Sequence, residues 1–208
     1  MDFSLPEEHF QRHISAILKE VLQGRETHLS IKDFTLKEES NAPWSLVEFV
    51  LLVDDCTFFL SGSGEGMTDA LFTALADHFS PQYLCLENVE FEDFRLKAAF
   101  KDGLRAARTD APVEITLALK TNRHARLYFR AHSHSLAMAA VEVVRTGIEF
   151  LINCEKAVIE LYSHLESLKA AKKEHLQEPY VLQLADIVKL TSFEKTIQRL
   201  KWQTSPPK

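Results

Sequence analysis

The sequence predicts an α+β fold made of two βββα units, with further helices at both ends of the chain. Two hydrophobic strand pairs each lead into a turn of small residues and an Ala-rich helix, and the second copy follows the first by about 69 residues, so that Thr57 corresponds to Arg126. A further strand-like segment precedes each pair. A repeat of this length indicates a duplicated supersecondary unit.

The composition excludes several classes of protein. The chain has 208 residues, of which 46% are hydrophobic, and a net charge of −6. This is enough apolar material for one sizeable core or two small ones, and the negative charge argues against a nucleic-acid partner. No apolar run approaches the roughly 18 residues of a membrane span, and the acidic N-terminus does not resemble a signal peptide. We therefore expect a cytoplasmic protein, with its three cysteines reduced and buried.

The first βββα unit is expected over residues 28–80, after an N-terminal helix within residues 1–27. Apolar residues recur at helical spacing up to Gly24, which ends that helix. Alternating and β-branched residues then predict three strands, the first with room for a bulge and the last two joined by a turn at Asp54-Asp55. The strands are expected at residues 29–36, 46–53 and 56–61, and the helix at residues 67–79.

The second unit is expected over residues 81–178 in the same order. Its strands are predicted at residues 84–91, 113–119 and 125–130, and residues 97–111 form an insertion with a short helix and a loop. A helix opens at Ser135, and apolar residues spaced four and three apart from Ala140 to Leu168 predict that it continues as a long packing helix, with Pro179 as its latest end. A last amphipathic helix, around residues 184–200, is expected within residues 179–208.

The sequence Gly62-Ser-Gly-Glu-Gly66 links a strand to a helix. Its glycines allow positive φ angles and a close approach to the backbone, and the start of the helix offers N–H groups that suit a carboxylate or a phosphate. Asp69 is placed to cap this turn. The spacing is neither that of a dinucleotide-binding loop nor that of a Walker loop. A purely structural role for the glycines is the alternative.

Two motifs carry a resemblance to a known family. Gly64-Glu-Gly-Met-Thr-Asp-Ala70 resembles the Gly-x-Gly-Pro-Val-Asp-Ala motif in the C-terminal regulatory domain of 2-isopropylmalate synthases and citramalate synthases. Residues 131–140 resemble that domain's second motif, Gly-x-Ser-x-Asn-Ile-Ile-Glu-Ala-Ser. The resemblance covers residues 28–154. Where the family's first motif has Pro, this chain has Met67. Where the second motif has its leading Gly, its Asn and its Glu, this chain has Ala131, Ser135 and Met138.

The resemblance implies a stand-alone regulatory-type domain rather than an enzyme. In the family, this domain has two βββα units, dimerises, and binds leucine or isoleucine between the units at the dimer interface. The chain is too short for the family's catalytic barrel, so we expect no synthase activity and no cofactor. It implies instead a homodimer that binds a branched-chain amino acid or a related acid, with a role in leucine biosynthesis and a separate synthase as a further candidate partner.

The ligand is expected at the two turns, and the first turn is expected to be the better site. The carboxylate of the ligand would lie on the N–H groups near residues 64–67, and its ammonium group would lie near Glu65 or Asp69. The side chain of the ligand would lie against the apolar residues of the two helix starts. The expected contacts are Gly62, Gly64, Glu65, Gly66, Met67, Asp69, Ala70, Ser133, Ser135, Leu136 and Ala139.

Other functions remain as alternatives. A protein-interaction or dimerisation scaffold that has lost its ligand is favoured by Met67, by Met138 and by the extra terminal helices. A zinc site at His132-Ser-His134 is disfavoured, because a segment that turns into a helix separates the two rings. A hydrolase is disfavoured because no nucleophile and base can be paired and no Gly-x-Ser-x-Gly motif occurs.

Overall fold

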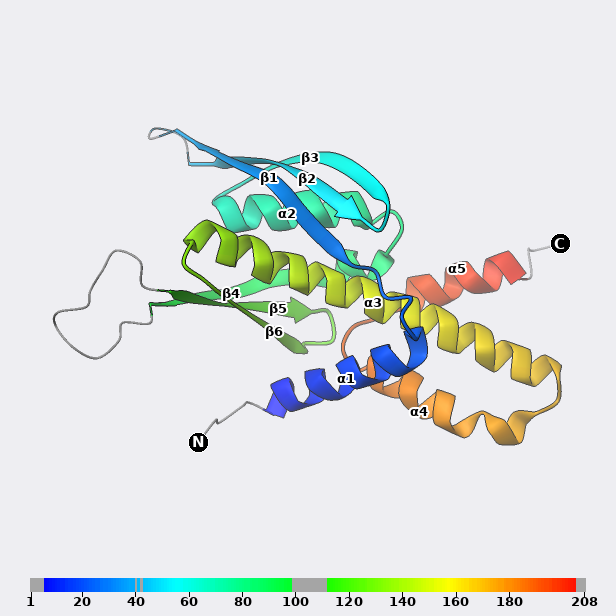
Figure 1. Cartoon of the computed structure of the whole chain (residues 1–208). Coiled ribbons are helices and arrows are strands. Elements are labelled where there is room, and N and C mark those ends of the chain that lie inside the picture. Colours follow the sequence, from blue (N-terminus) through cyan, green and yellow to red (C-terminus); the bar gives the residue numbers. More distant parts are fainter. Residues whose placement is uncertain (1–5, 40, 42, 99–111, 205–208) are drawn as a thin grey trace.

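Two antiparallel sheets enclose two helices in a four-layer arrangement (Figure 1). The structure is a computed structural model and describes residues 6–39, 41, 43–98 and 112–204. The strand orders are β1-β2-β3 and β4-β5-β6, and each sheet is followed by a helix. The predicted α+β fold of two βββα units is therefore confirmed.

The elements follow the predicted order along the chain. Helix α1 is Pro6–Leu22, and the first unit consists of β1 Leu29–Glu38, β2 Ser45–Val53, β3 Cys56–Gly64 and α2 Met67–Phe79. The second unit consists of the 3₁₀ turn η1 Leu84–Asn88, β4 Val89–Ala98, β5 Val113–Thr121, β6 Arg126–Ser133 and α3 Leu136–Ala170. The 3₁₀ turn η2 Glu174–Leu176 and the helices α4 Glu178–Ile187 and α5 Glu194–Thr204 complete the described chain.

The core lies between the sheets, where α2 packs on β2 and β3 and α3 packs on β5 and β6. Because successive strand residues point to opposite faces, alternate apolar residues supply the inner surfaces. On β2 these are Val47, Phe49 and Leu51, and on β5 they are Ile115, Leu117 and Leu119. Helices α2 and α3 also contact each other, so the two units share one continuous core.

Several local predictions are confirmed. The bulge in β1 lies between Lys32 and Thr35, and the turn at Asp54-Asp55 joins β2 to β3. Ser135 is the N-cap of α3, which runs for 35 residues. The residues at the four-three spacing from Ala140 to Leu165 are buried, so this seam packs as predicted.

The start of the second unit differs from the prediction. Residues Leu84–Asn88 form a 3₁₀ turn, and the strand begins only at Val89. The reason is a contact distant in sequence, because Glu155 of α3 accepts hydrogen bonds from the backbone N–H groups of Leu84 and Cys85. At its other end β4 continues to Ala98, where it pairs with Val113, so Lys97 and Ala98 belong to the strand. The rest of the expected insertion, residues 99–111, lies outside the described residues.

The C-terminal region also differs from the prediction. Helix α3 ends at Ala170, and Pro179 lies in the first turn of α4, where a residue without an N–H group is tolerated. The single expected helix over residues 184–200 is divided between α4 and α5, because Leu190 and Phe193 turn into the core between them. In the described residues, no helix combines the length and the apolar character needed to cross a bilayer.

Candidate binding surface at the helix starts

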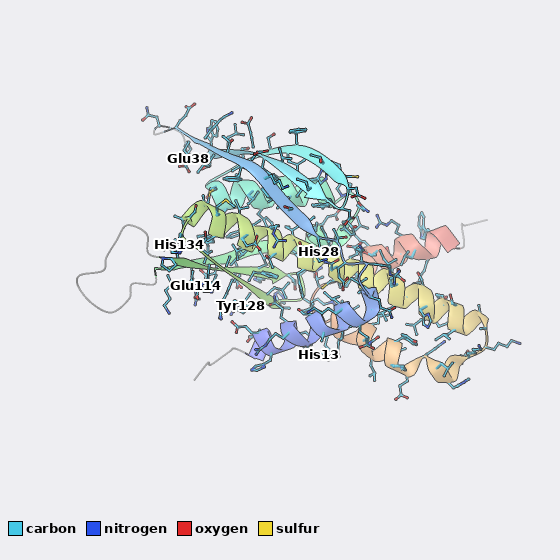
Figure 2. The ribbon with its side chains drawn as sticks, viewed as in Figure 1. His13, His28, Glu38, Glu114, Tyr128 and His134 are labelled. Atoms are coloured by element: carbon cyan, nitrogen blue, oxygen red, sulfur yellow. The ribbon has the colours of Figure 1, made fainter. Side chains whose placement is uncertain are left out.

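Both predicted turns lie at one end of the molecule. Helices α2 and α3 begin at the same end, where β1 and β4 finish (Figure 1). Figure 2 shows Glu38, the last residue of β1, and His134, two residues before α3, at this end. We term this region the helix-start end and define it as residues 36–38, 44, 62–70, 96–97 and 131–140.

Two glycines of the first turn have the structural role that the sequence left open as the alternative. Gly62 and Gly64 lie within β3, and neither they nor Gly66 adopts a positive φ angle. A Cβ atom at Gly62 would lie 2.6 Å from both the Ala70 carbonyl oxygen and the Ala74 Cβ, which is too close for non-bonded atoms. Of the two properties that the sequence suggested for these glycines, the structure thus uses the close approach and not the positive φ angle. Glycine is needed because α2 packs directly against the backbone of β3.

Asp69 closes the turn that leads into α2. Its Oδ2 accepts a hydrogen bond from the Glu65 N–H at 3.0 Å, while Gly66, the N-cap residue, has an extended backbone with φ −167°. The predicted capping role of Asp69 is therefore confirmed. Glu65 is exposed and Met67 is half-buried, but Ala70 is fully buried and belongs to the core.

The second turn is capped by serine hydroxyl groups. Ser135 Oγ accepts a hydrogen bond from the Met138 N–H at 3.3 Å, and Ser133 Oγ accepts one from the Ser135 N–H at 3.1 Å. The first turn of α3 contains no acidic residue, in contrast to the first turn of α2, which contains Asp69. Ala139 is fully buried, so Leu136 and Met138 are the residues through which the start of α3 reaches the surface.

Exposed apolar side chains gather at the helix-start end. Leu136 and Met138 are 48% and 49% exposed, and Leu96 is 49% exposed. Leu36 pairs with the buried Val47 and Leu96 with the buried Ile115, so both extend an inner sheet face beyond the helices. Trp44, just before β2, is also exposed. Among the described residues, this end of the sandwich thus presents several exposed apolar side chains, a feature that marks binding surfaces.

The cavities that we describe lie elsewhere. None of the five is lined by residues 62–70 or 131–140. A groove of about 290 Å³ lies between α1, α3 and α4, where Arg25 pairs with Glu160 at 2.6 Å and the ring centroids of His164 and Tyr180 lie 4.3 Å apart, with the rings tilted by 54°. A ligand at the helix-start end would therefore bind outside these five cavities.

Cysteine and histidine chemistry offers no alternative centre in the described part of the chain. Cys85 and Cys154 are buried as predicted, and burial raises the pKa of both thiols. Cys56, which directly follows the hairpin turn, is exposed, so the prediction that it is buried is wrong. His132 Nε2 lies 3.4 Å from Glu114 Oε2. Among the described residues, no three potential ligands from His, Cys, Asp and Glu gather where they could hold a metal ion.

Polar residues of α3 form a set of contacts that the sequence analysis missed. Glu149 Oε2 accepts from the Leu29 N–H at 2.8 Å, and Arg145 Nη1 donates to the Leu29 carbonyl oxygen at 3.0 Å. Asn153 and Glu155, both buried, bind backbone groups of other segments in the same way. The sequence did contain a sign of these contacts, because an amide and a carboxylate beside the apolar seam of a predicted core helix need hydrogen-bond partners when they are buried.

The sequence matches no protein-family model and no curated protein sequence. The resemblance to the regulatory domain of the synthases therefore rests on the two turn motifs and on the repeated βββα order.

Proposed function

We propose that this chain is a non-catalytic regulatory-type module that binds a small amphipathic acid, of the branched-chain amino acid class, at the helix-start end. The observation that carries the proposal is the combination found at the start of α3. There, a helix terminus without an acidic residue lies beside the exposed side chains of Leu136 and Met138. One end of the ligand would be anionic and the other aliphatic.

The start of α3 suits the carboxylate better than the start of α2. The first N–H groups of a helix have no partner within the helix, and the helix dipole favours a negative charge there. At α2, the Asp69 carboxylate of the first turn already places a negative charge beside the helix start and would repel a second anion. The proposed carboxylate position therefore moves from residues 64–67 to the turn around Ser133 and Ser135, and Glu65 and Asp69 are left for the ammonium group.

The apolar surroundings fit the aliphatic part of the same ligand. Leu36, Leu96, Leu136 and Met138 come from both sheets and from α3, and each is at least one third exposed. Because none of the five described cavities encloses these side chains, we expect a dissociation constant of about 1 mM, which corresponds to about −4 kcal/mol. Binding of leucine would connect the chain with the control of leucine biosynthesis in the cytoplasm, with a separate synthase as a partner.

One observation favours a second candidate function, a protein-interaction scaffold that has lost ligand binding. Gly62 and Gly64, which the ligand hypothesis reserved for a close approach of the ligand, are already in contact with α2. The exposed apolar residues would then dock a protein partner rather than an amino acid.

Titration of the full chain separates the two functions. Calorimetry and thermal-shift measurements with leucine, isoleucine and valine, up to about 10 mM, should show binding with a dissociation constant of about 1 mM. Leu136→Asp should abolish binding, because it removes an apolar contact and places a negative charge at the start of α3. Val181→Asp, at a residue of α4 that is 47% exposed, is the matched control and should leave binding unchanged.

Two results would contradict the ligand proposal. The absence of any response to the three amino acids would remove it and leave the scaffold. A response that persists in Leu136→Asp would mean that the ligand binds elsewhere.

A further inference from the structure

Three of the four sheet edges in the described structure are protected. An unpaired edge presents a row of N–H and C=O groups that can pair with another chain, and proteins usually cover or charge it. At β6, the edge of the second sheet, the Gln11 side chain of α1 binds both backbone groups of Tyr128. Its Nε2 donates to the carbonyl oxygen at 3.0 Å, and its Oε1 accepts from the N–H at 2.8 Å.

The edges at β1 and β4 are protected by other means. At β1, Glu149 and Arg145 bind the N–H and the C=O of Leu29, and a bulge interrupts the strand further along. At β4, charged side chains line the strand and oppose pairing with another chain. They are Glu90, Glu92, Asp93, Arg95 and Lys97.

The edge at β3 has none of these protections. Strand β3 borders the first sheet, and its contacts are with β2 along one edge and with α2 on its inner face (Figure 1). Its nine residues, Cys56–Gly64, include no charged residue and no proline, and their pairing with β2 has no register shift. Phe59, near the middle of the strand, is 84% exposed, the largest value among the exposed large hydrophobic side chains.

The backbone N–H and C=O groups of Phe59 point away from β2, toward the free edge of the sheet. The N–H and C=O groups of Leu29 both bind side chains of α3, so Leu29 and its partner Val53 on β2 do not form a hydrogen-bonded pair. The N–H and C=O groups of Val53 therefore point the other way, toward Cys56 on β3. Antiparallel strands alternate hydrogen-bonded and non-bonded pairs, so the N–H and C=O of Phe59 face the free edge. Phe59 is also the repeat equivalent of Tyr128, 69 residues later, whose outward groups Gln11 binds.

We propose that β3 pairs antiparallel with β3 of a second copy of this chain, so that two three-stranded sheets join into one of six strands. With residue 57 opposite residue 63 and residue 59 opposite residue 61, the four outward-facing residues of each strand form four hydrogen-bonded pairs. This register brings the two Phe59 rings into the diagonal contact that aromatic side chains can make across strands.

A second copy fits this edge for two reasons. Each chain carries a net charge of −6, and the neutral β3 lets two such chains meet without opposing like charges. Antiparallel pairing of a strand with itself is two-fold symmetric, and it consumes the free edge of both chains, so assembly stops at the dimer. The proposal does not depend on the ligand site, which lies at the helix-start end.

The oligomeric mass of the full chain tests the proposal. Light scattering over a concentration series, under reducing conditions, should give about twice the 23.7 kDa of one chain. Phe59→Lys places two positive charges next to each other across the two-fold axis, and Ser61→Pro removes an N–H group that faces the free edge. Both variants should be monomeric. Ser30→Lys, on the outer face at the opposite edge of the same sheet, is the matched control and should remain dimeric.

Circular dichroism and thermal unfolding show whether the variants are folded. Because Phe59 is exposed, Phe59→Lys should keep the native spectrum, and its response to leucine should match that of the wild-type chain. A wild-type chain that stays monomeric up to about 100 μM would overturn the proposal, since specific dimers are half-formed at concentrations near their dissociation constant. A folded Phe59→Lys or Ser61→Pro variant that stays dimeric would equally overturn it.

Discussion

Asn153 of α3 binds both backbone groups of Thr27. Its Oδ1 accepts from the Thr27 N–H at 2.8 Å, and its Nδ2 donates to the Thr27 carbonyl oxygen at 3.0 Å. Thr27 directly precedes the first unit, whereas Asn153 lies in the helix that completes the second. Lys156, one turn further along α3, donates to Thr27 Oγ1 at 2.8 Å. The long helix of the second unit thus fixes the point where the first unit begins.

Replacement of Asn153 should destabilise the fold. Asn153→Ala leaves two buried backbone groups without a partner, and we expect the free energy of unfolding to fall by about 2–4 kcal/mol. Chemical denaturation measures the loss. Ser163→Ala, at an exposed residue of the same helix, should change stability by less than about 0.5 kcal/mol. Equal effects of the two substitutions would contradict the role of Asn153.

Glu155 has the corresponding role for the second unit. Its carboxylate, fully buried, accepts from the Leu84 N–H at 3.2 Å, from the Cys85 N–H at 2.8 Å and from Thr196 Oγ1 at 2.7 Å. These contacts hold the 3₁₀ turn before β4 and also attach α5. Arg199 Nη2 lies 3.7 Å from the same carboxylate and offsets part of its charge.

A double-mutant cycle tests whether these contacts form one network. Glu155→Gln turns an amide N–H₂ group toward the N–H and O–H donors that now bind the carboxylate, and should lower the free energy of unfolding by about 2–4 kcal/mol. Thr196→Val should lower it by about 1 kcal/mol. Because both changes remove the same hydrogen bond, the double variant should lose less than the sum of the single losses. Urea unfolding of the four proteins measures the difference. Strict additivity would show that Thr196 and Glu155 contribute independently.

The sequence predicted the elements whose pattern is local. The β-branched residues of β2, the seam of α3 and the cap at Ser135 each depend on neighbours within one element. The 3₁₀ turn at Leu84 has the alternating residues of a strand, but Glu155, 71 positions away, binds its N–H groups instead. Contacts of this kind arise from the packing of distant segments, and no local pattern encodes them.

The candidate site was predicted in part. The repeat correctly identified two turns, and the fold brings them to the same end of the molecule. The sequence left the role of the glycines open, because glycine serves equally where φ is positive and where two segments approach closely. The small residues Ala70 and Ala74, one helical turn apart, were the signal for close packing, since they face Gly62.

The three cysteines should differ in reactivity. Cys56 is exposed, whereas Cys85 and Cys154 are buried and their thiols have raised pKa values. A thiol reagent should therefore modify one cysteine per native chain and all three after unfolding. Cys56→Ser should remove the native reaction. Rapid reaction of two or three thiols in the native protein would contradict the buried positions of Cys85 and Cys154.

Alkaline pH should destabilise the protein through the same thiols. Burial raises the pKa of Cys154, and for Cys85 the nearby Glu155 charge adds to the effect of burial. The unfolded chain releases these protons near pH 8.5 whereas the folded chain retains them, so stability is constant below that pH and falls as the pH rises above it. Unfolding free energies between about pH 8 and 10 measure the slope, and Cys154→Ala should reduce it.

Gly62 of β3 and Gly66, the N-cap of α2, should lose stability to different extents when each is replaced by alanine. At Gly62 an added Cβ would lie 2.6 Å from the Ala70 carbonyl oxygen and from the Ala74 Cβ, so Gly62→Ala must push α2 away from β3 at a cost of about 2–3 kcal/mol. At Gly66 an added Cβ meets nothing within 4 Å and the backbone is extended, so Gly66→Ala should cost only about 0.5–1 kcal/mol, because alanine is a poorer N-cap residue than glycine. Thermal unfolding of the two variants provides the comparison. A similar loss in both would contradict the packing role of Gly62, whereas a clearly larger loss at Gly62 would assign that residue to the packing of α2.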